Sequence, residues 1–314
     1  MLFGRTAKSQ DITEFISFYS NGDFVAELQI IDSLKRTDFN EETIHHIDNI
    51  EHEVPFKSVI FYAKSIAYAK EGILDSALFY FELSLDNCLI LSHKSISRDS
   101  IILSVIDGEI QSDVIGSLSD YYSDFVYQYK TATDTSLINI LSDLYNNDQN
   151  GRKLYTSYLQ GNSPEISTDS INNLIDNADS QNREILKSII QKFGWPGFSK
   201  VGYKGDNMAF FIVQHSDLDL NFQEFGLQSI LNEYNCFNTS CQNVAMLVDR
   251  HLINNRKEQI FGTQFRIVSE GKDKKLLPKP LVHNTELTDY LRSKFGLESL
   301  EKYLFKASKR YVRN

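Results

Sequence analysis

The chain has 314 residues, which favours two domains of ordinary size over one continuous core. Its 42 acidic side chains outnumber its 32 basic ones, in a composition typical of a soluble globular protein. A continuous basic face able to neutralise phosphates is not expected, so we predict no nucleic-acid partner. No apolar run is long enough to cross a bilayer, and no membrane span is predicted.

The cysteines predict buried thiols and no disulfide framework, because Cys88, Cys236 and Cys241 are few, odd in number and form no CxxC pair. Residues 7–10, Ala-Lys-Ser-Gln, resemble the end of a signal peptide, but the apolar core of such a signal does not precede them. Two compartments therefore stay open: the cytoplasm, or export if the start of a signal peptide is missing.

Residues 1–131 predict short helices separated by Asn, Asp and Gly turns. The clearest signal is a tetratricopeptide-like helix-turn-helix pattern of large, small, aromatic and Gly positions between residues 58 and 87. Its members are Phe61, Ser65, Tyr68, Gly72, Ala77, Phe81 and Ser84.

A weaker echo of this pattern follows Asp11, with Phe18, Gly22 and Ala26, and residues 41–52 are expected to add a helix between the two. A degenerate solenoid and a plain helical bundle both fit this pattern. A solenoid would offer a groove to a protein or peptide partner, whereas a bundle would only support the second domain.

Residues 132–314 predict a second, mainly helical domain that begins near the capping residue Asp134. Helices are expected over residues 137–146, 151–159, 168–193, 219–234, 244–253, 285–295 and 297–311. Residues 257–268 alternate like a strand that returns after a turn as a β-hairpin. The predicted fold class is therefore mainly α, with a tetratricopeptide-like N-terminal region and a C-terminal helical domain carrying a small β-hairpin.

The most informative residue is His215, which occupies an apolar position. Met208, Phe211, Ile212 and His215 are spaced i, i+3, i+4 and i+7, which is the buried stripe of an amphipathic helix. A core histidine bonded through one nitrogen is the commoner reason for such a placement, and a catalytic imidazole is the alternative.

Other polar residues share apolar helix faces in the same way. Asp179 and Asn182 precede Leu186 on one face, although a solvated first turn of that helix fits them equally well. Asp249 lies on the inward face of the helix that carries Arg250. Because buried polar groups are costly unless they bond to each other or to a ligand, their recurrence predicts a polar site.

Roles can be assigned to these side chains. His215 would be a general base oriented by Asp249 or Asp179. Arg250 offers a planar fork for an anion, unless it forms an interhelical lock with an aspartate. The remaining candidates are substrate-binding side chains: Asn182, Gln259, Thr263, Gln264 and Arg292.

No metal site is predicted from the spacing of the histidines, and a metal held by His215 with Asp179, Asp217 or Asp249 is the minor alternative. His45 and His46 are adjacent and project differently, while His215, His251 and His283 belong to separate elements. Nucleophile elbow, P-loop, HExxH and dinucleotide-binding motifs are absent from the sequence, which therefore names no cofactor.

The order of seven short motifs between about residues 136 and 305 resembles an uncharacterised, largely bacterial domain family of unknown function. Its pattern runs DQxxR, DxxN, GWP, QHxD, DR, QxYGTQ and RxxxGL. The motifs stand here at residues 148–152, 179–182, 194–196, 214–217, 249–250, 259–264 and 292–297. Phe261 replaces the usual tyrosine, and Leu291 stands where a first arginine is common, which leaves Arg292 alone and weakens a two-arginine anion clamp. The resemblance implies a family but neither an activity nor a substrate.

Two functions from different classes fit these observations. The first is a hydrolase or transferase that acts on an anionic small molecule at a His/Asp/Arg/Gln site. The second is a non-enzymatic binding or scaffold protein whose polar cluster fixes the packing of helices. The first is favoured, because polar side chains from several elements converge on apolar faces.

Overall fold

The computed structural model describes residues 11–21, 57–86, 127, 130–162, 166–234, 238–270 and 273–311. The chain divides into two compact units. Unit 1 comprises Met1–Tyr129 with Asn235–Phe237, and unit 2 comprises Lys130–Tyr234 with Asn238–Asn314. The domain boundary proposed after residue 131 stays a prediction.

Unit 1 is helical where it is described. Helix α1 spans Ile12–Ser20, α4 spans Lys57–Lys70 and α5 spans Leu74–Asp86. Helix α1 begins at Asp11, whose side chain accepts a hydrogen bond from the backbone N–H of Thr13.

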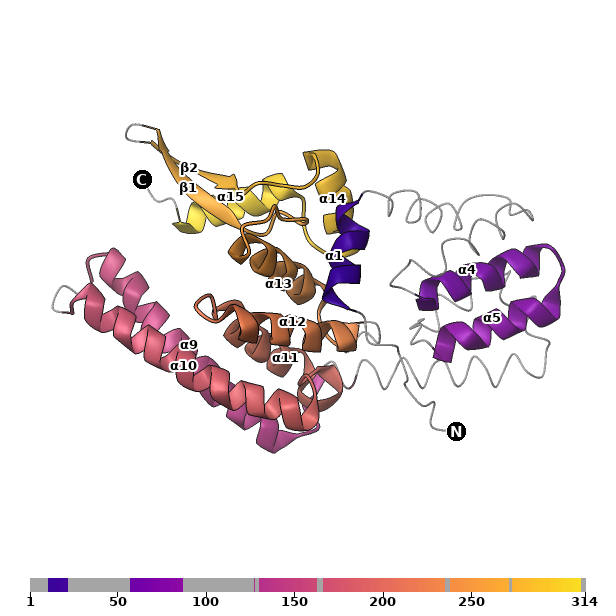
Figure 1. Ribbon diagram of the computed structural model, residues 1–314, viewed down its shortest axis with the longest axis horizontal. Coiled ribbons are helices and arrows are strands. Elements are labelled where there is room, and N and C mark those ends of the chain that lie inside the picture. The colour runs from indigo at the N-terminus through magenta and orange to yellow at the C-terminus, as the bar shows by residue number, and fades with distance from the viewer. Residues whose placement is uncertain are drawn as a thin grey trace. The chain divides into compact units, whose positions relative to one another are not determined.

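Helices α4 and α5 form the predicted helix-turn-helix (Figure 1). The chain turns at Gly72, and the rings of Tyr68 and Tyr80 stack 5.4 Å apart across the two helices. The inward positions of the pattern are buried: Phe61, Ser65, Ala77, Phe81 and Ser84. The array of repeats stays a prediction, because Gly22, Ala26 and the helix expected over residues 41–52 lie outside the described residues, as do Cys88 and Cys236.

Unit 2 is mainly α-helical with one small β-hairpin among its described residues, which confirms the predicted fold class in these respects. Its helices are α9 (Thr135–Leu159), α10 (Thr168–Phe193), α11 (Phe198–Gln214), α12 (Leu220–Tyr234), α13 (Cys241–Asn254), α14 (Thr285–Lys294) and α15 (Leu300–Tyr311). Strands β1 (Phe265–Glu270) and β2 (Asp273–Pro278) pair antiparallel, with Phe265 opposite Pro278. No described helix is long and apolar enough to traverse a membrane.

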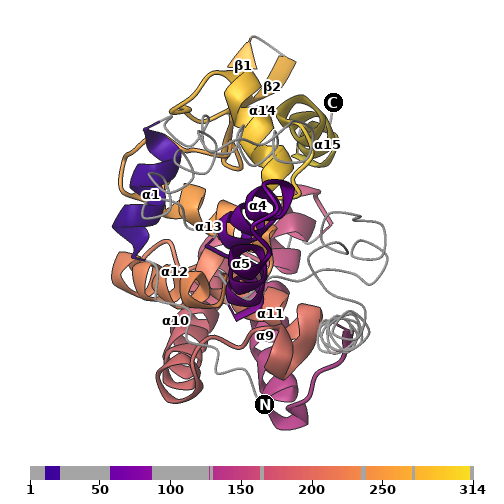
Figure 2. The same cartoon turned by 90° about the vertical axis from the view of Figure 1, so that its right-hand side faces the viewer.

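Helices α9 and α10 lie side by side as a long antiparallel pair (Figures 1 and 2). The prediction of two helices over 137–146 and 151–159 is wrong, because α9 continues through Gly151 without a break. A Cβ atom at Gly151 would lie 2.6 Å from Cγ1 of Ile175 on α10. This glycine therefore permits the close approach of two helices instead of ending one.

The GWP segment anchors the turn between α10 and α11. Trp195 donates its indole N–H to Asp206 over 2.7 Å, and the same carboxylate accepts hydrogen bonds from the side chains of Thr239 and Asn243. Burial raises the pKa of Asp206 to about 6, although these hydrogen bonds act in the opposite direction. Asp206 thus joins the GWP segment and α11 to the start of α13.

The predicted strand over residues 257–268 is also wrong in its first half. Residues 259–264 form a buried loop, and β1 begins only at Phe265. The backbone N–H groups of Ile260, Phe261 and Thr263 donate to the Asp249 carboxylate, so they are not available to a neighbouring strand. Gly262 adopts a φ of 68°, which disfavours any residue with a Cβ atom.

Candidate functional site

His215 pairs with an aspartate that the sequence did not single out. It is the C-terminal capping residue of α11, and its Nδ1 lies 2.8 Å from Oδ1 and 3.0 Å from Oδ2 of Asp148 on α9. Asp148 is buried, whereas the side chain of His215 is 21% exposed. No described residue forms a hydrogen bond with Nε2 of His215. One ring nitrogen is therefore fixed by a buried carboxylate, and the other is available.

Arg152 extends this pair to α10. Its Nη1 and Nη2 donate to the two carboxylate oxygens of Asp179 over 3.0 and 2.9 Å. The same Nη1 lies 3.3 Å from Oδ1 of Asp148, one helical turn away on α9. Gln149 also donates to Asp148, over 2.6 Å. We call Asp148, Arg152, Asp179 and His215 the histidine cluster.

Asn182 lies next to this cluster but serves the packing of the two long helices. Its amide donates to the backbone carbonyl of Leu144 over 2.9 Å and accepts a hydrogen bond from Asn147 over 3.1 Å. Because Asn182 is buried and bonded on both sides, it offers no free group to a substrate.

A second group, the arginine cluster, consists of Asp217, Arg250, Asn254 and Gln264. Arg250 donates to both carboxylate oxygens of Asp217, from Nε over 2.7 Å and from Nη2 in a very short contact. Its Nη1 donates to the side chain of Gln264 over 2.9 Å. Asn254 adds a hydrogen bond to Asp217. Although burial acts to raise it, the hydrogen bonds and charge of Arg250 hold the pKa of Asp217 below its usual value.

The two clusters meet at the end of α11. His215 and Asp217 are two residues apart, so their Cα atoms are separated by at most about 7 Å. His215 contacts α9, and Asp217 contacts α13. This short segment therefore joins polar side chains from five parts of unit 2: α9, α10, the turn after α11, α13 and the 259–264 loop.

Asp249 does not bond to His215. Its buried carboxylate accepts three backbone hydrogen bonds, from Ile260, Phe261 and Thr263, over 2.8 to 2.9 Å. Burial raises its pKa to about 6 against the effect of these bonds. Asp249 thus folds the 259–264 loop and holds Gln264 beside Arg250.

Gln259 and Arg292 serve the same loop. Gln259 accepts from the backbone N–H of Gln264 and donates to its carbonyl oxygen. Arg292 is fully buried, donates to the carbonyl of Phe261 over 2.7 Å and lies over the ring of Tyr303. These contacts bury the guanidinium of Arg292 beside the 259–264 loop, away from solvent.

The hydroxyl of Thr263 accepts a hydrogen bond from the side-chain amide of Gln264 over 3.2 Å.

Of the nine predicted site residues, the structure places His215 and Asp179 in one cluster and Arg250 and Gln264 in the other. Sequence reasoning missed Asp148, Arg152 and Asp217 as site residues. The DQxxR and QHxD motifs were the signal that could have found them.

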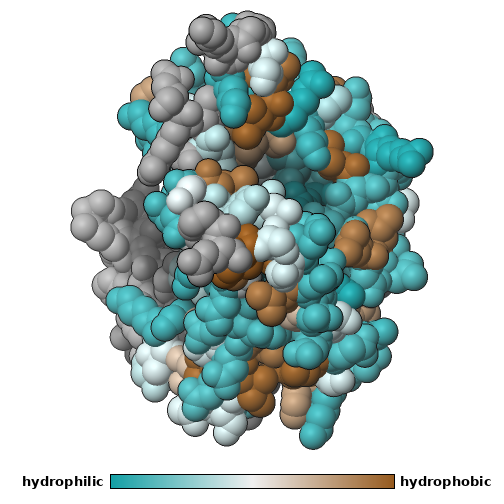
Figure 3. All heavy atoms as spheres, turned by 90° about the vertical axis from the view of Figure 1, so that its left-hand side faces the viewer, coloured by the Kyte–Doolittle hydropathy of each residue, from teal (hydrophilic) through white to brown (hydrophobic). Residues whose placement is uncertain are grey.

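The side of the molecule shown in Figure 3 contains a hollow surrounded mainly by hydrophilic residues. In Figure 1 this is the side on which the tip of the α9–α10 pair projects. Within the described part of the chain, no group of His, Cys, Asp and Glu side chains has the arrangement of a metal site.

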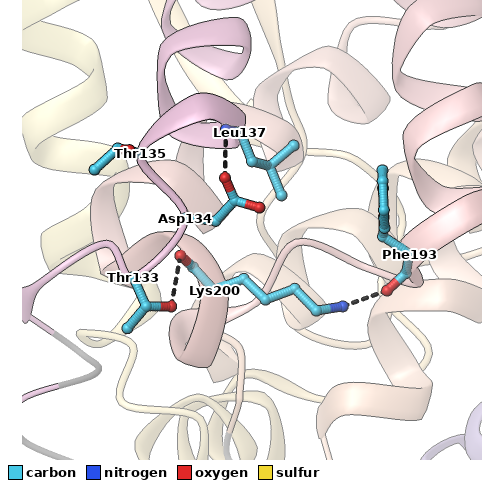
Figure 4. A pocket seen from close by; sticks show the side chains of 6 residues that line it. All are labelled: Thr133, Asp134, Thr135, Leu137, Phe193 and Lys200. Atoms are coloured by element: carbon cyan, nitrogen blue, oxygen red, sulfur yellow. Dashed lines mark hydrogen bonds between the residues drawn. The ribbon is translucent and has the colours of Figure 1, made fainter.

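A separate cavity of about 460 Å³ opens beside the N-terminus of α9 (Figure 4). It is lined by Thr133, Asp134, Thr135, Leu137, Phe193 and Lys200. Asp134 caps α9 through the N–H of Leu137, and the Lys200 ammonium donates to the carbonyl of Phe193. None of the predicted site residues lines this cavity.

The chain belongs to a family of unknown function, DUF6624, whose model matches residues 138–312. The match contains both polar clusters and the 259–264 loop, and it confirms the resemblance to an uncharacterised domain family. No curated protein and no solved structure matches the chain.

Proposed function

We propose that unit 2 is a hydrolase or transferase in which His215 is the general base. The observation that carries this proposal is the hydrogen bond between Nδ1 of His215 and the buried carboxylate of Asp148. A carboxylate in this position keeps a proton on Nδ1 and leaves Nε2 able to accept a proton from a water or a hydroxyl nucleophile. Asp148 takes the orienting role first expected of Asp249 or Asp179.

For the substrate we propose an anionic small molecule that binds at Arg250 and Gln264. Both side chains lie in the arginine cluster, whose Asp217 is two residues along the chain from the base. The guanidinium of Arg250 is now bound to Asp217, but the Asp217 side chain is 41% exposed. A substrate carboxylate or phosphate would replace Asp217 on the same planar donors.

One observation favours a second function, a binding or scaffold protein. Arg152 and Arg250 each already have a carboxylate partner, so both clusters are bonded without a ligand. In this function the clusters hold four helices together, and the helical hairpin of unit 1 recruits a protein or peptide partner.

Acylation of histidines with diethylpyrocarbonate separates the two functions without a known substrate. The reagent attacks an accessible, unprotonated imidazole nitrogen. On the folded full-length chain, we expect peptide mass spectrometry to find His215 acylated faster than His251 and His283. Asp148→Asn should slow the reaction at His215, because the amide no longer fixes the tautomer.

Asp143→Asn is the matched control, since Asp143 is exposed on the same helix. A His215 that reacts only after unfolding, or equally fast in Asp148→Asn and in the original chain, would exclude the general base and support the scaffold function.

A further inference from the structure

We infer that Arg152, held in place by Asp179, is a positioning residue that keeps Asp148 ionised and so keeps the His215 proton on Nδ1. This inference rests on the proposed function. In this inference, the ion pair between Arg152 on α9 and Asp179 on α10 controls the proposed base, His215, in addition to packing the two helices together.

The geometry shows how Arg152 reaches both carboxylates. Two parallel hydrogen bonds to Asp179 fix the plane of the guanidinium. The same Nη1 atom then lies 3.3 Å from Oδ1 of Asp148 and donates to the Asp148 backbone carbonyl over 3.2 Å. Arg152 therefore cannot turn away from Asp148 without breaking its bidentate contact with Asp179.

The charges of the histidine cluster give this arrangement a chemical consequence. Asp148 and Asp179 are two negative groups, and Arg152 is one positive group between them. A neutral His215 leaves one net negative charge, and a proton on His215 brings the cluster to zero. The cluster is thus electrically balanced in the state reached once the base has accepted a proton.

Without the Arg152 charge, no cation would lie between the Asp148 and Asp179 carboxylates, and like charges in one partly buried site disfavour having both groups ionised. A protonated Asp148 would donate its own O–H to Nδ1 of His215. The imidazole proton would then move to Nε2, and the atom proposed to act as base would be blocked. Arg152 prevents this reversal.

Nitrogen-15 NMR of the histidine rings in the full-length chain tests the inference, because it distinguishes protonated from unprotonated ring nitrogens. His215→Gln identifies the His215 signals by their loss. At a pH where His215 is neutral, we expect a protonated Nδ1 and an unprotonated Nε2. In Arg152→Gln the two types of signal should exchange or become mixed, whereas Arg152→Lys, which keeps the positive charge, should change them less.

Arg183→Gln is the control, because Arg183 lies on α10 and pairs with Asp219 outside the histidine cluster. A folded Arg152→Gln chain with unchanged His215 signals would overturn the inference, even if its stability were lower. If Arg152→Gln does not fold, Arg152→Met, which removes the same charge, takes its place, and unchanged signals again overturn the inference. Failure of the proposed function looks different: the original chain would already carry its His215 proton on Nε2.

Discussion

Asp148 and His215 are 67 positions apart in the chain, and the buried carboxylate of the first lies 2.8 Å from Nδ1 of the second. The two partners have unequal surroundings. Asp148 also contacts Arg152 and Gln149, whereas described residues leave Nε2 of His215 without a hydrogen bond. Asp148 should therefore contribute more to stability, and His215 more to the proposed chemistry.

Replacing the two partners should therefore have unequal effects on stability. His215→Ala should lower the free energy of unfolding by about 1 kcal/mol, the usual net value of one hydrogen bond. Asp148→Ala should cost about 3 kcal/mol, because it leaves several buried or half-buried donors without their acceptor. Urea unfolding of both variants, with the exposed Asp143→Ala as the reference, measures this difference. An equal or larger loss in His215→Ala would identify a structural imidazole.

Asp249 should be a stronger determinant of stability than either partner. Asp249→Ala removes the acceptor of three buried backbone N–H groups, so we expect a loss of at least about 3 kcal/mol, with disorder of the 259–264 loop. Asp176→Ala, at an exposed position of α10, should change stability by less than about 0.5 kcal/mol. Hydrogen exchange at Phe261 and Thr263 gives a local readout. Continued protection of these amides in Asp249→Ala would contradict the account.

Helical periodicity predicted which faces are buried better than it predicted which residues meet. Asp249 lies on an inward face as expected, but its partner is the backbone of the 259–264 loop and not His215. A face is a local property of a sequence, whereas the course of a loop is set by the contacts it makes on folding. For this reason the predicted strand over 257–268 included Gly262, which lies in the loop.

The Asp148–Arg152 pair was missed for a related reason. The predicted helices over 137–146 and 151–159 leave Asp148 between them, which conceals the i, i+4 spacing of Asp148 and Arg152 on one helix. Only the presence of Ile175 on α10 shows why a glycine is needed inside α9. No local pattern in the sequence indicates the contact between Gly151 and Ile175.

Gly151→Ala offers a direct test of this close approach. Alanine has a higher helix propensity than glycine by about 1 kcal/mol, so an unconstrained position would gain stability. Here the new Cβ would lie 2.6 Å from Cγ1 of Ile175, and we expect a net loss of about 1 kcal/mol from overpacking.

Thermal unfolding of Gly151→Ala, Ile175→Ala and the double variant forms a thermodynamic cycle for this contact. The alanine at 151 should be less harmful when Ile175 is already truncated, because the clashing atom is gone. Asn150→Ala, at the exposed neighbouring position, reports propensity alone. Strictly additive effects of the two substitutions would show that the helices do not approach as closely as described.

In mildly acidic solution, the free energy of unfolding should rise as the pH falls, which is the reverse of ordinary acid denaturation. Burial raises the pKa of Asp206 and of Asp249 from 3.8 to about 6, so the folded chain binds more protons than the unfolded chain between these values. Their contribution to stability is fully present below pH 3.8 and is lost as the pH rises through 6. The free energy of unfolding should therefore increase as the pH falls from about 6.5 towards 4.5.

Asp217 acts in the opposite direction, because its folded-state pKa is lowered. Its ion pair with Arg250 stabilises the chain above the usual aspartate pKa and is lost in stronger acid. Stability should consequently pass through a maximum in acid and then fall. Urea unfolding at closely spaced pH values between 3 and 7 measures both limbs, and the acid limb should be weaker in Asp217→Asn. A stability that falls steadily from pH 6.5 to 4.5 would mean that Asp206 and Asp249 stay ionised in the core, with their hydrogen bonds outweighing the effect of burial.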